Sequence, residues 1–287
     1  MDETPLLQDD GLLIDEVGTW AEEKYRLVAL YAALFAKSMR AKWSSLVYLD
    51  LFAGAGRVKI RNTTRIFASS PIRVLDVEPH FDRFIFCEMD VARADALKER
   101  CDRDYPDHEV RVLPGNVNQM AQRILDELPD YRPGQGVLAF CFVDPCKMSD
   151  LRFETLAALA DRWMDFLVLI PSEMDAQRAE HRYRNVDNLV VDEFLGDSLW
   201  RDRWTKAAST GIRFEQFIVE EFGCSMERIG RINPGLATTF TMRNSRNRRL
   251  YRLVLYSKSK LALKFWKQAQ KYANPNRDLF DGTEFVD

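Results

Sequence analysis

The sequence is poor in the residues that build metal centres and disulfide frameworks. It has three histidines and five cysteines in 287 residues, and no two cysteines stand in Cys-x-x-Cys spacing. An odd cysteine count is atypical of a disulfide-stapled domain, and the scattered histidines complete no zinc-ligand pattern. The sequence therefore predicts reduced thiols and no structural zinc.

Long hydrophobic runs, repeats and low-complexity linkers are also missing. No apolar stretch approaches the roughly 20 residues that span a bilayer. The start, Met-Asp-Glu-Thr-Pro, lacks the basic and then apolar pattern of a signal peptide. Hydrophobic residues make up 46% of the chain, which is enough for a sizeable core and excludes a disordered chain. We expect a cytoplasmic protein without membrane association, built as one domain.

The small net charge conceals an uneven distribution. The total is −3, but residues 1–200 carry 24 basic and 35 acidic side chains, whereas residues 201–287 carry 17 and 9. Residues 228–277 hold 13 lysines or arginines and no aspartate or glutamate. Because a one-sided basic segment is the footprint of a polyanion partner, the low total does not exclude nucleic acid.

Helix and strand patterns alternate along most of the chain. An acidic, weakly patterned arm at 1–18, which we expect to be loosely held, precedes an amphipathic helix at 20–42. Apolar strand patterns then occur at 46–51, 83–88, 109–113, 137–143 and 166–170, with helical patterns at 92–101, 117–128 and 153–161 between them. This alternation predicts a mostly parallel, doubly wound α/β sheet.

The pattern changes after residue 171. Helical segments at 186–195 and 214–222 come first, then two β-like runs at 238–242 and 250–256, then a last helix at 260–272. The two β-like runs are joined by a short basic turn, so we expect a C-terminal antiparallel hairpin.

A glycine-rich turn follows the first predicted strand. It contains Asp50, Phe52, Ala53, Gly54 and Gly56, and glycines at a strand end let a ligand approach the backbone. The third glycine of the dinucleotide fingerprint and the Gly-Lys-Ser/Thr of a phosphate loop are both absent. The turn suits the amino-acid part of S-adenosylmethionine; the alternative is a plain tight turn.

Polar residues end the next strands. Glu88 can accept hydrogen bonds from both ribose hydroxyls, and Asn116 can read an adenine edge. Asp144 and Pro145 end the most apolar strand, where they can hold an acceptor amine or hydroxyl against a methyl donor. The alternatives are a solvated carboxylate at Glu88, an ordinary left-handed turn at Asn116, and a helix N-cap at Asp144.

Cys146 follows directly. A Pro-Cys pair at this place is where enzymes that methylate pyrimidine carbon keep a nucleophilic thiolate. Their other motifs are absent here, and a free, partly buried thiol is the default interpretation.

In this order the residues resemble class I S-adenosylmethionine-dependent methyltransferases, and more narrowly the three-Cys-motif partner protein family (TcmP). The matching segments are Val17-Gly-Thr-Trp20 with Glu23-Lys24, Tyr48 to Gly54, Ser70-Pro71, Glu88, Asp144-Pro145, Ile170-Pro171 with Met174-Asp175, Phe194-Leu-Gly196 with Trp200, and Tyr251 to Tyr256-Ser-Lys-Ser.

The resemblance implies a Rossmann-like class I methyltransferase fold, S-adenosylmethionine as cofactor, and a partner that resembles radical S-adenosylmethionine enzymes and carries the three cysteines. On this basis residues 1–44 form an arm and helix, and residues 45–287 form the methyltransferase-like domain. The family pattern also places Trp20 and Lys24 over the site.

Two departures from related patterns stand out. Enzymes that methylate exocyclic base amines continue Asp-Pro with Pro-Tyr or Pro-Phe, whereas Asp144-Pro145 continues with Cys146-Lys147. Ser69 replaces the glycine usual before the Ser-Pro pair. The first departure argues against methylation of a base amine.

The basic C-terminal region has two parts. Around the hairpin turn lie Arg243, Arg246, Arg248, Arg249 and Arg252, and along the last helix lie Lys260, Lys264, Lys267 and Lys271. We expect them to form one polyanion-binding face; the alternatives are a solvated helix face or an acidic protein partner.

The sequence thus predicts a methyltransferase that acts on nucleic acid or a nucleotide-derived substrate. Two alternatives stay open. One is a Rossmann scaffold that binds cofactor or partner without catalysis, and the other is a carbon methyltransferase with Cys146 as nucleophile.

Overall fold

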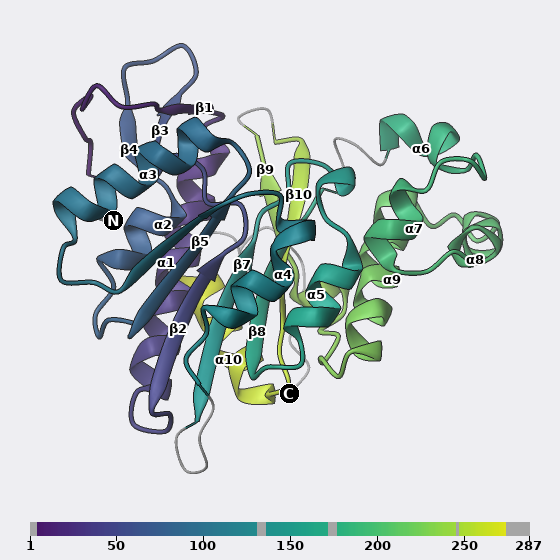
Figure 1. Ribbon diagram of the computed structural model, residues 1–287. Coiled ribbons are helices and arrows are strands. Elements are labelled where there is room, and N and C mark those ends of the chain that lie inside the picture. Colours follow the sequence, from purple (N-terminus) through teal and green to yellow (C-terminus); the bar gives the residue numbers. More distant parts are fainter. Residues whose placement is uncertain (1–4, 131–135, 172–176, 245–246, 274–287) are drawn as a thin grey trace.

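A seven-stranded sheet forms the centre of the protein in the computed structural model (Figure 1), which describes residues 5–130, 136–171, 177–244 and 247–273. The strand order is β6-β5-β2-β7-β8-β10-β9. The strands are β2 Ser45–Asp50, β5 Arg83–Glu88, β6 Val110–Pro114, β7 Val137–Val143, β8 Met164–Ile170, β9 Phe240–Arg243 and β10 Arg249–Tyr256.

The first five strands in this order pair in parallel, whereas β10 is antiparallel to both β8 and β9. This is the Rossmann-like class I methyltransferase arrangement. The predicted fold class is therefore confirmed, including the antiparallel C-terminal hairpin.

Helices cover both faces of the sheet. One face carries α1 Trp20–Met39, α2 Ser70–Leu75, α3 Val91–Asp104 and α10 Lys260–Ala273; the other carries α4 Val117–Asp126, α5 Phe153–Leu159, α7 Val190–Leu195 and α9 Phe214–Arg228. A hydrophobic core lies on each face of the sheet, and alternate residues of a strand contribute to one or the other. Tyr48, for example, packs on the α1 side and Leu49 on the α5 side. Burial on both faces explains the nearly continuous apolar runs of the central strands.

Several elements were not predicted. They include the short helices α6 Gln177–Tyr183 and α8 Trp200–Ala208 and a small sheet of β1 Asp15–Val17, β3 Arg57–Ile60 and β4 Ile66–Ala68. The strands of the small sheet have three or four residues, too few to establish a period.

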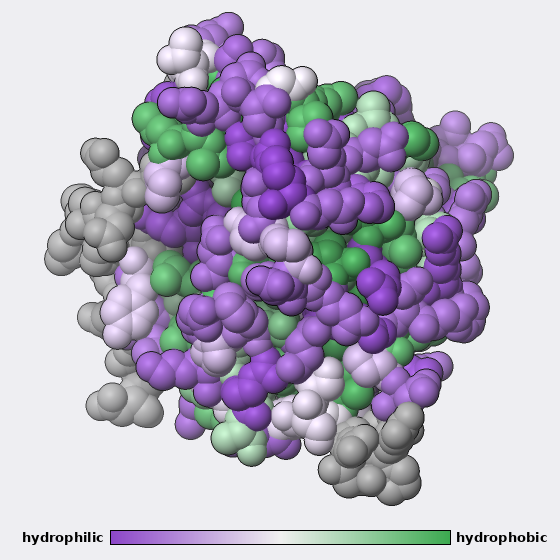
Figure 2. Space-filling model, turned by 60° about the vertical axis from the view of Figure 1, so that its left-hand side comes forward, coloured by the Kyte–Doolittle hydropathy of each residue, from purple (hydrophilic) through white to green (hydrophobic). Residues whose placement is uncertain are grey.

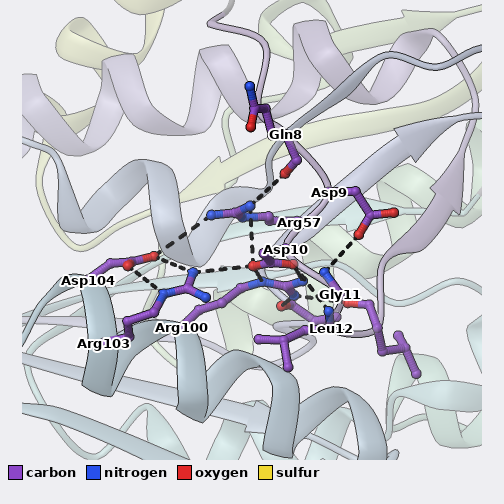
Figure 3. A network of polar contacts seen from close by, with 11 residues as sticks. Gln8, Asp9, Asp10, Gly11, Leu12, Arg57, Arg100, Arg103 and Asp104 are labelled. Carbon is purple, nitrogen blue, oxygen red and sulfur yellow. Dashed lines mark hydrogen bonds and ion pairs between the residues drawn. The ribbon is translucent and has the colours of Figure 1, made fainter.

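The expectation of a loosely held N-terminal arm is wrong for its described part. β1 pairs with β3, and the buried Arg100 side chain donates to both carboxylate oxygens of Asp10, at 2.7 and 2.9 Å, and to the Leu13 carbonyl at 2.9 Å. Arg57 lies 3.2 Å from the same carboxylate (Figure 3). Asp10 and Asp15 of the arm have partners far along the chain, which local sequence patterns do not reveal.

The face in Figure 2 is mostly hydrophilic, and hydrophobic side chains reach it only in small groups. Within the described residues, no helix combines the length and apolarity needed to cross a bilayer.

Candidate functional site

The predicted cofactor residues converge because parallel strands end at the same edge of the sheet. β5 and β7 flank β2, so Glu88, the turn after Asp50, and Asp144 become neighbours. The Gly54 N–H donates to Glu88 Oε2 at 2.8 Å, and the Asp90 N–H donates to Oε1 at 2.9 Å. The Glu88 carboxylate therefore ties the glycine-rich turn to the end of β5.

The turn needs its glycines. Gly54 and Gly56 have φ angles of 63° and 87°, a region that favours glycine. A Cβ on Gly56 would lie 2.8 Å from the Leu97 side chain.

Asp15 and Arg100 support this turn from behind. The Ala55 N–H donates to Asp15 Oδ2 at 3.0 Å, and Arg100 donates to the Ala55 carbonyl. Sequence reasoning missed both, since neither belongs to a recognisable motif.

Asp50 shapes the turn rather than facing a ligand. It has no accessible surface, accepts from the Ser70 hydroxyl at 2.6 Å and from the Phe52 N–H at 3.2 Å, and burial raises its pKa to about 7. Ala53 and Gly56 are buried as well, so Phe52 and Gly54 are the predicted turn residues with accessible surface.

Asn116 caps a helix. Its side-chain oxygen accepts from the Asn118 N–H at 3.0 Å at the start of α4, and its φ of −70° is not left-handed. The oxygen keeps a second lone pair and the amide nitrogen keeps its donors, so both remain able to contact a base, and the adenine contact stays a prediction.

A buried ion pair occupies the end of β7. Lys24 donates to Asp144, and both side chains are largely buried. Burial disfavours the ammonium charge, but the Asp144 carboxylate outweighs this effect and raises the pKa of Lys24 above its usual value. The structure thus brings Lys24 to the predicted acceptor site.

Aromatic rings surround this pair. The Lys24 ammonium lies 5.0 Å from the centre of the Trp20 ring and 4.7 Å from that of Tyr25, so cation–π attraction adds to the ion pair. Trp20 in turn contacts Tyr251 of β10, with ring centres 5.0 Å apart. Tyr25 and Tyr251 were not predicted as site residues.

Pro145 is buried and shapes the chain after Asp144, whereas Cys146 is exposed at the residue level. Burial of the thiol, with the nearby Asp144 charge, raises the pKa of Cys146. Such a thiol is mainly protonated at neutral pH and is a poor nucleophile.

The predicted basic face is divided. β10 runs antiparallel to β8 with Arg252 opposite Ile170, so Arg243, Arg248 and Arg249 lie at the same end of the sheet as Asp144. α10 begins after the other end of β10, about 23 Å away for a strand of this length. Lys260 and Lys264, in the first turns of α10, therefore lie at the opposite end of the sheet from Asp144.

Four further residues singled out in the sequence need correction or exclusion. Arg252 is buried and donates to the Thr239 hydroxyl at 3.0 Å, so it is not part of a basic surface. Arg246 and the Met174-Asp175 pair lie outside the described residues. Among the described residues, no group of three His, Cys, Asp or Glu side chains is arranged to hold a metal ion.

Comparison with known proteins gives structural but no sequence matches. No family model and no curated protein matches the chain, so membership of the three-Cys-motif partner family is not confirmed.

Several solved structures resemble the chain at low identity. A Legionella pneumophila protein of the DUF519 family model is 13% identical, with a TM-score of 0.47 over 90% of this chain and 94% of that one. The O-methyltransferase TomG from Streptomyces achromogenes, solved with SAM, is 13% identical, with a TM-score of 0.45 over 83% and 81%. TYW2 from M. jannaschii, solved with AdoMet, is 8% identical, with a TM-score of 0.43 over 89% and 87%. At these values the fold assignment rests on this chain's own strand order.

Proposed function

We propose that this protein is a cytoplasmic S-adenosylmethionine-dependent methyltransferase that acts on nucleic acid or a nucleotide-derived substrate. The observation that carries the proposal is the convergence of the glycine-rich turn, Glu88 and Asp144 at the carboxyl ends of β2, β5 and β7. In an open α/β sheet this crevice is where ligands bind.

The residues present fit the cofactor. Gly54 leaves the backbone of the turn uncovered, and Phe52 beside it keeps accessible surface. Each Glu88 oxygen accepts one backbone N–H and retains a lone pair for a ribose hydroxyl. S-adenosylmethionine supplies the methyl group on its sulfonium.

The Lys24–Asp144 pair fits an acceptor-positioning role. An acceptor N–H or O–H can donate to Asp144, whose carboxylate stabilises the positive charge that develops on the attacking atom, and Lys24 holds that carboxylate in place. Holding the acceptor in line with the donor, away from water, is most of what methyl transfer needs.

Trp20, which keeps accessible surface, lies next to this pair and packs on the buried Tyr251. Trp20 can take the stacking role of the aromatic residue that is missing after Asp144-Pro145. Arg243, Arg248 and Arg249, at the same end, provide positive charge for a phosphate backbone. A three-Cys-motif protein is the partner that the sequence resemblance proposes.

One alternative has its own support. Because Asp144 is already paired with Lys24, a scaffold that binds cofactor without catalysis fits the same geometry. The raised pKa of Cys146 argues against the carbon-methylating alternative.

Calorimetric titration with S-adenosylhomocysteine and S-adenosylmethionine tests the cofactor site. Wild type is expected to bind both, and Glu88→Ala to bind at least about tenfold more weakly, since hydrogen bonds to a charged group contribute about 1.5–3 kcal/mol. Glu88→Gln keeps the side-chain shape, and Glu99→Ala, on the exposed face of α3, is the matched control. No heat with either ligand on folded wild type would contradict the proposal.

Transfer of labelled methyl groups to RNA, DNA and nucleotides then separates enzyme from scaffold. Incorporation that Asp144→Asn abolishes supports catalysis. Binding without transfer to any of these acceptors, with the candidate partner added, favours the scaffold.

A further inference from the structure

A cavity lies at the end of the sheet opposite Asp144. It has a volume of about 310 Å³ and lies between α1 and α10, over the first residues of β7 and β8. This volume is within the range of small-ligand pockets. Since it is separated from the glycine-rich turn by the length of the strands, it does not belong to the cofactor crevice.

The floor of the cavity carries an unusual carboxylate. Asp165 is the one polar residue in the otherwise apolar β8 and is 7% exposed. Among the described residues it has no ion pair, because the nearby Arg231 donates instead to the Met164 and Ala160 carbonyls at 3.1 and 3.0 Å. A nearly buried charge without an ion pair is costly, so the site favours a ligand that brings hydrogen-bond donors.

A second polar group that lines the cavity lacks a hydrogen-bond partner within the described ranges. The hydroxyl of Tyr31 is buried and has no hydrogen-bond partner in the described part of the chain. Asp165 itself receives a hydrogen bond from Ser257, which leaves most of its acceptor capacity free.

The walls are aromatic and the rim is basic. Trp43 and Trp163 lie with ring centres 5.8 Å apart, and Phe265 of α10 adds a third ring. Lys258 lies 4.9 Å from the centre of the Trp163 ring, and Lys42 lines the cavity from the end of α1. Flat aromatic walls fit a planar ring, and the carboxylate on the floor accepts hydrogen bonds from donors on the buried edge of that ring. The lysines at the rim fit a phosphate group attached to the exposed side of the ligand.

The lysines of α10 extend this rim. Leu261 and Phe265 line the cavity, and Lys260 and Lys264, each one position earlier in the helix, are exposed. The start of the basic stripe along α10 therefore borders this cavity and not the methyl-transfer site.

We propose that this cavity binds a guanine nucleotide, with the base on Asp165 and the phosphate at Lys258 and Lys42. Guanine presents N1–H and N2–H side by side, so both donate to one carboxylate. Adenine and cytosine place an acceptor beside their amine, and uracil flanks its N–H with two carbonyls, so each sets an acceptor against the carboxylate. The proposal is independent of methyl transfer.

Calorimetric titration of the full chain with GMP, IMP and AMP tests it. We expect GMP to bind at least tenfold more tightly than IMP, which lacks the N2 amine, and AMP to bind no better than IMP. Asp165→Asn should weaken GMP binding at least tenfold, because the N–H₂ group of the introduced amide faces the N–H donors of guanine. Lys258→Gln, on the exposed rim, should weaken GMP but not guanosine, and it tests the site even if Asp165→Asn is misfolded.

Acidification and competition give independent checks. Burial raises the pKa of Asp165 to about 6, against the effects of the Ser257 hydrogen bond and Arg231, so binding of guanosine, which has no phosphate that titrates in this range, should weaken as the pH falls from 7 to 5. Saturating S-adenosylhomocysteine should leave GMP binding unchanged. Displacement of GMP, equal binding of GMP and AMP, or unchanged binding by folded Asp165→Asn or Lys258→Gln would each overturn the proposal, as would the absence of GMP binding.

A short guanine-containing RNA distinguishes a free nucleotide from a nucleic-acid end. If the bound base belongs to an RNA chain, reversing the charge of Lys260 and Lys264 should weaken RNA binding and leave GMP binding unchanged. If the RNA binds no better than GMP, a free nucleotide is the ligand. In both cases the guanine site stands.

Discussion

Gly56 is a residue at which backbone conformation and packing both exclude a side chain. Gly56→Ala combines strain at a φ of 87° with a contact of 2.8 Å to Leu97, whereas Gly211, at a φ of 83°, has nothing within 4 Å of an added Cβ. We expect Gly211→Ala to cost about 1 kcal/mol and Gly56→Ala about 1–3 kcal/mol more in urea unfolding. Equal costs would show that packing behind the turn is not constrained.

The Lys24–Asp144 pair makes a second prediction at the residue scale. Lys24→Met leaves a carboxylate largely buried without its partner, so the free energy of unfolding should fall by about 3–5 kcal/mol. Adding Asp144→Asn should restore part of that loss, since the two changes remove one interaction. Strictly additive losses in this double-mutant cycle would mean that the two groups do not interact in solution.

At the scale of elements, the N-terminal segment supports the cofactor turn through Arg100. This side chain donates to Asp10 (Figure 3) and to the backbone carbonyls of Leu13 and Ala55, so the segment and the turn share one buried cation. A substitution that loosens the N-terminal segment should therefore also destabilise the glycine-rich turn.

Asp10→Asn removes the charge that balances Arg100. We expect a loss of about 3 kcal/mol in unfolding free energy at pH 7, against less than about 0.5 kcal/mol for Asp102→Asn in the exposed pair with Lys98. The Arg100 hydrogen bonds hold the pKa of Asp10 well below its usual range. Because a lowered pKa stabilises the fold fully above the unfolded value of about 4, that contribution should decline progressively as the pH falls from about 4 towards the lowered folded value.

Urea unfolding at several pH values measures both effects. The difference between wild type and Asp10→Asn should shrink on acidification. A difference that stays constant down to pH 3 would assign the loss to packing instead of charge.

At the scale of the whole molecule, strand and helix patterns predicted the central sheet because its strands are buried on both faces and its helices on one. β5 and β7 have the predicted bounds, Arg83–Glu88 and Val137–Val143. The parallel order then brought Glu88 and Asp144 to the turn, as the strand-end rule predicts.

What the sequence could not predict depends on contacts between distant segments. Asp50 looked like a ligand contact, but the Ser70 hydroxyl and full burial turn it inward. The basic residues looked like one face, but the reversal of β10 sends the hairpin turn and the start of α10 to opposite ends. Asp165 fell just outside the strand expected at 166–170, and a single carboxylate next to a strand forms no motif that indicates a site.

The two ends of the sheet give the molecule two separate sites in this account. Arg248→Glu and Arg249→Glu should reduce RNA binding and the steepness of its salt dependence without affecting GMP binding, because these residues lie at the same end of the sheet as Asp144 and at the opposite end from Lys258. Filter binding over a salt series measures this. Unchanged RNA affinity in the double variant would remove the hairpin turn from the substrate surface.

A crystal structure of the full chain with S-adenosylhomocysteine tests the central claim most directly. We expect the ribose hydroxyls on the Glu88 carboxylate and the homocysteine part along the turn at Gly54, facing the Lys24–Asp144 pair. A ligand bound elsewhere, or no bound ligand at saturating concentration, would contradict it.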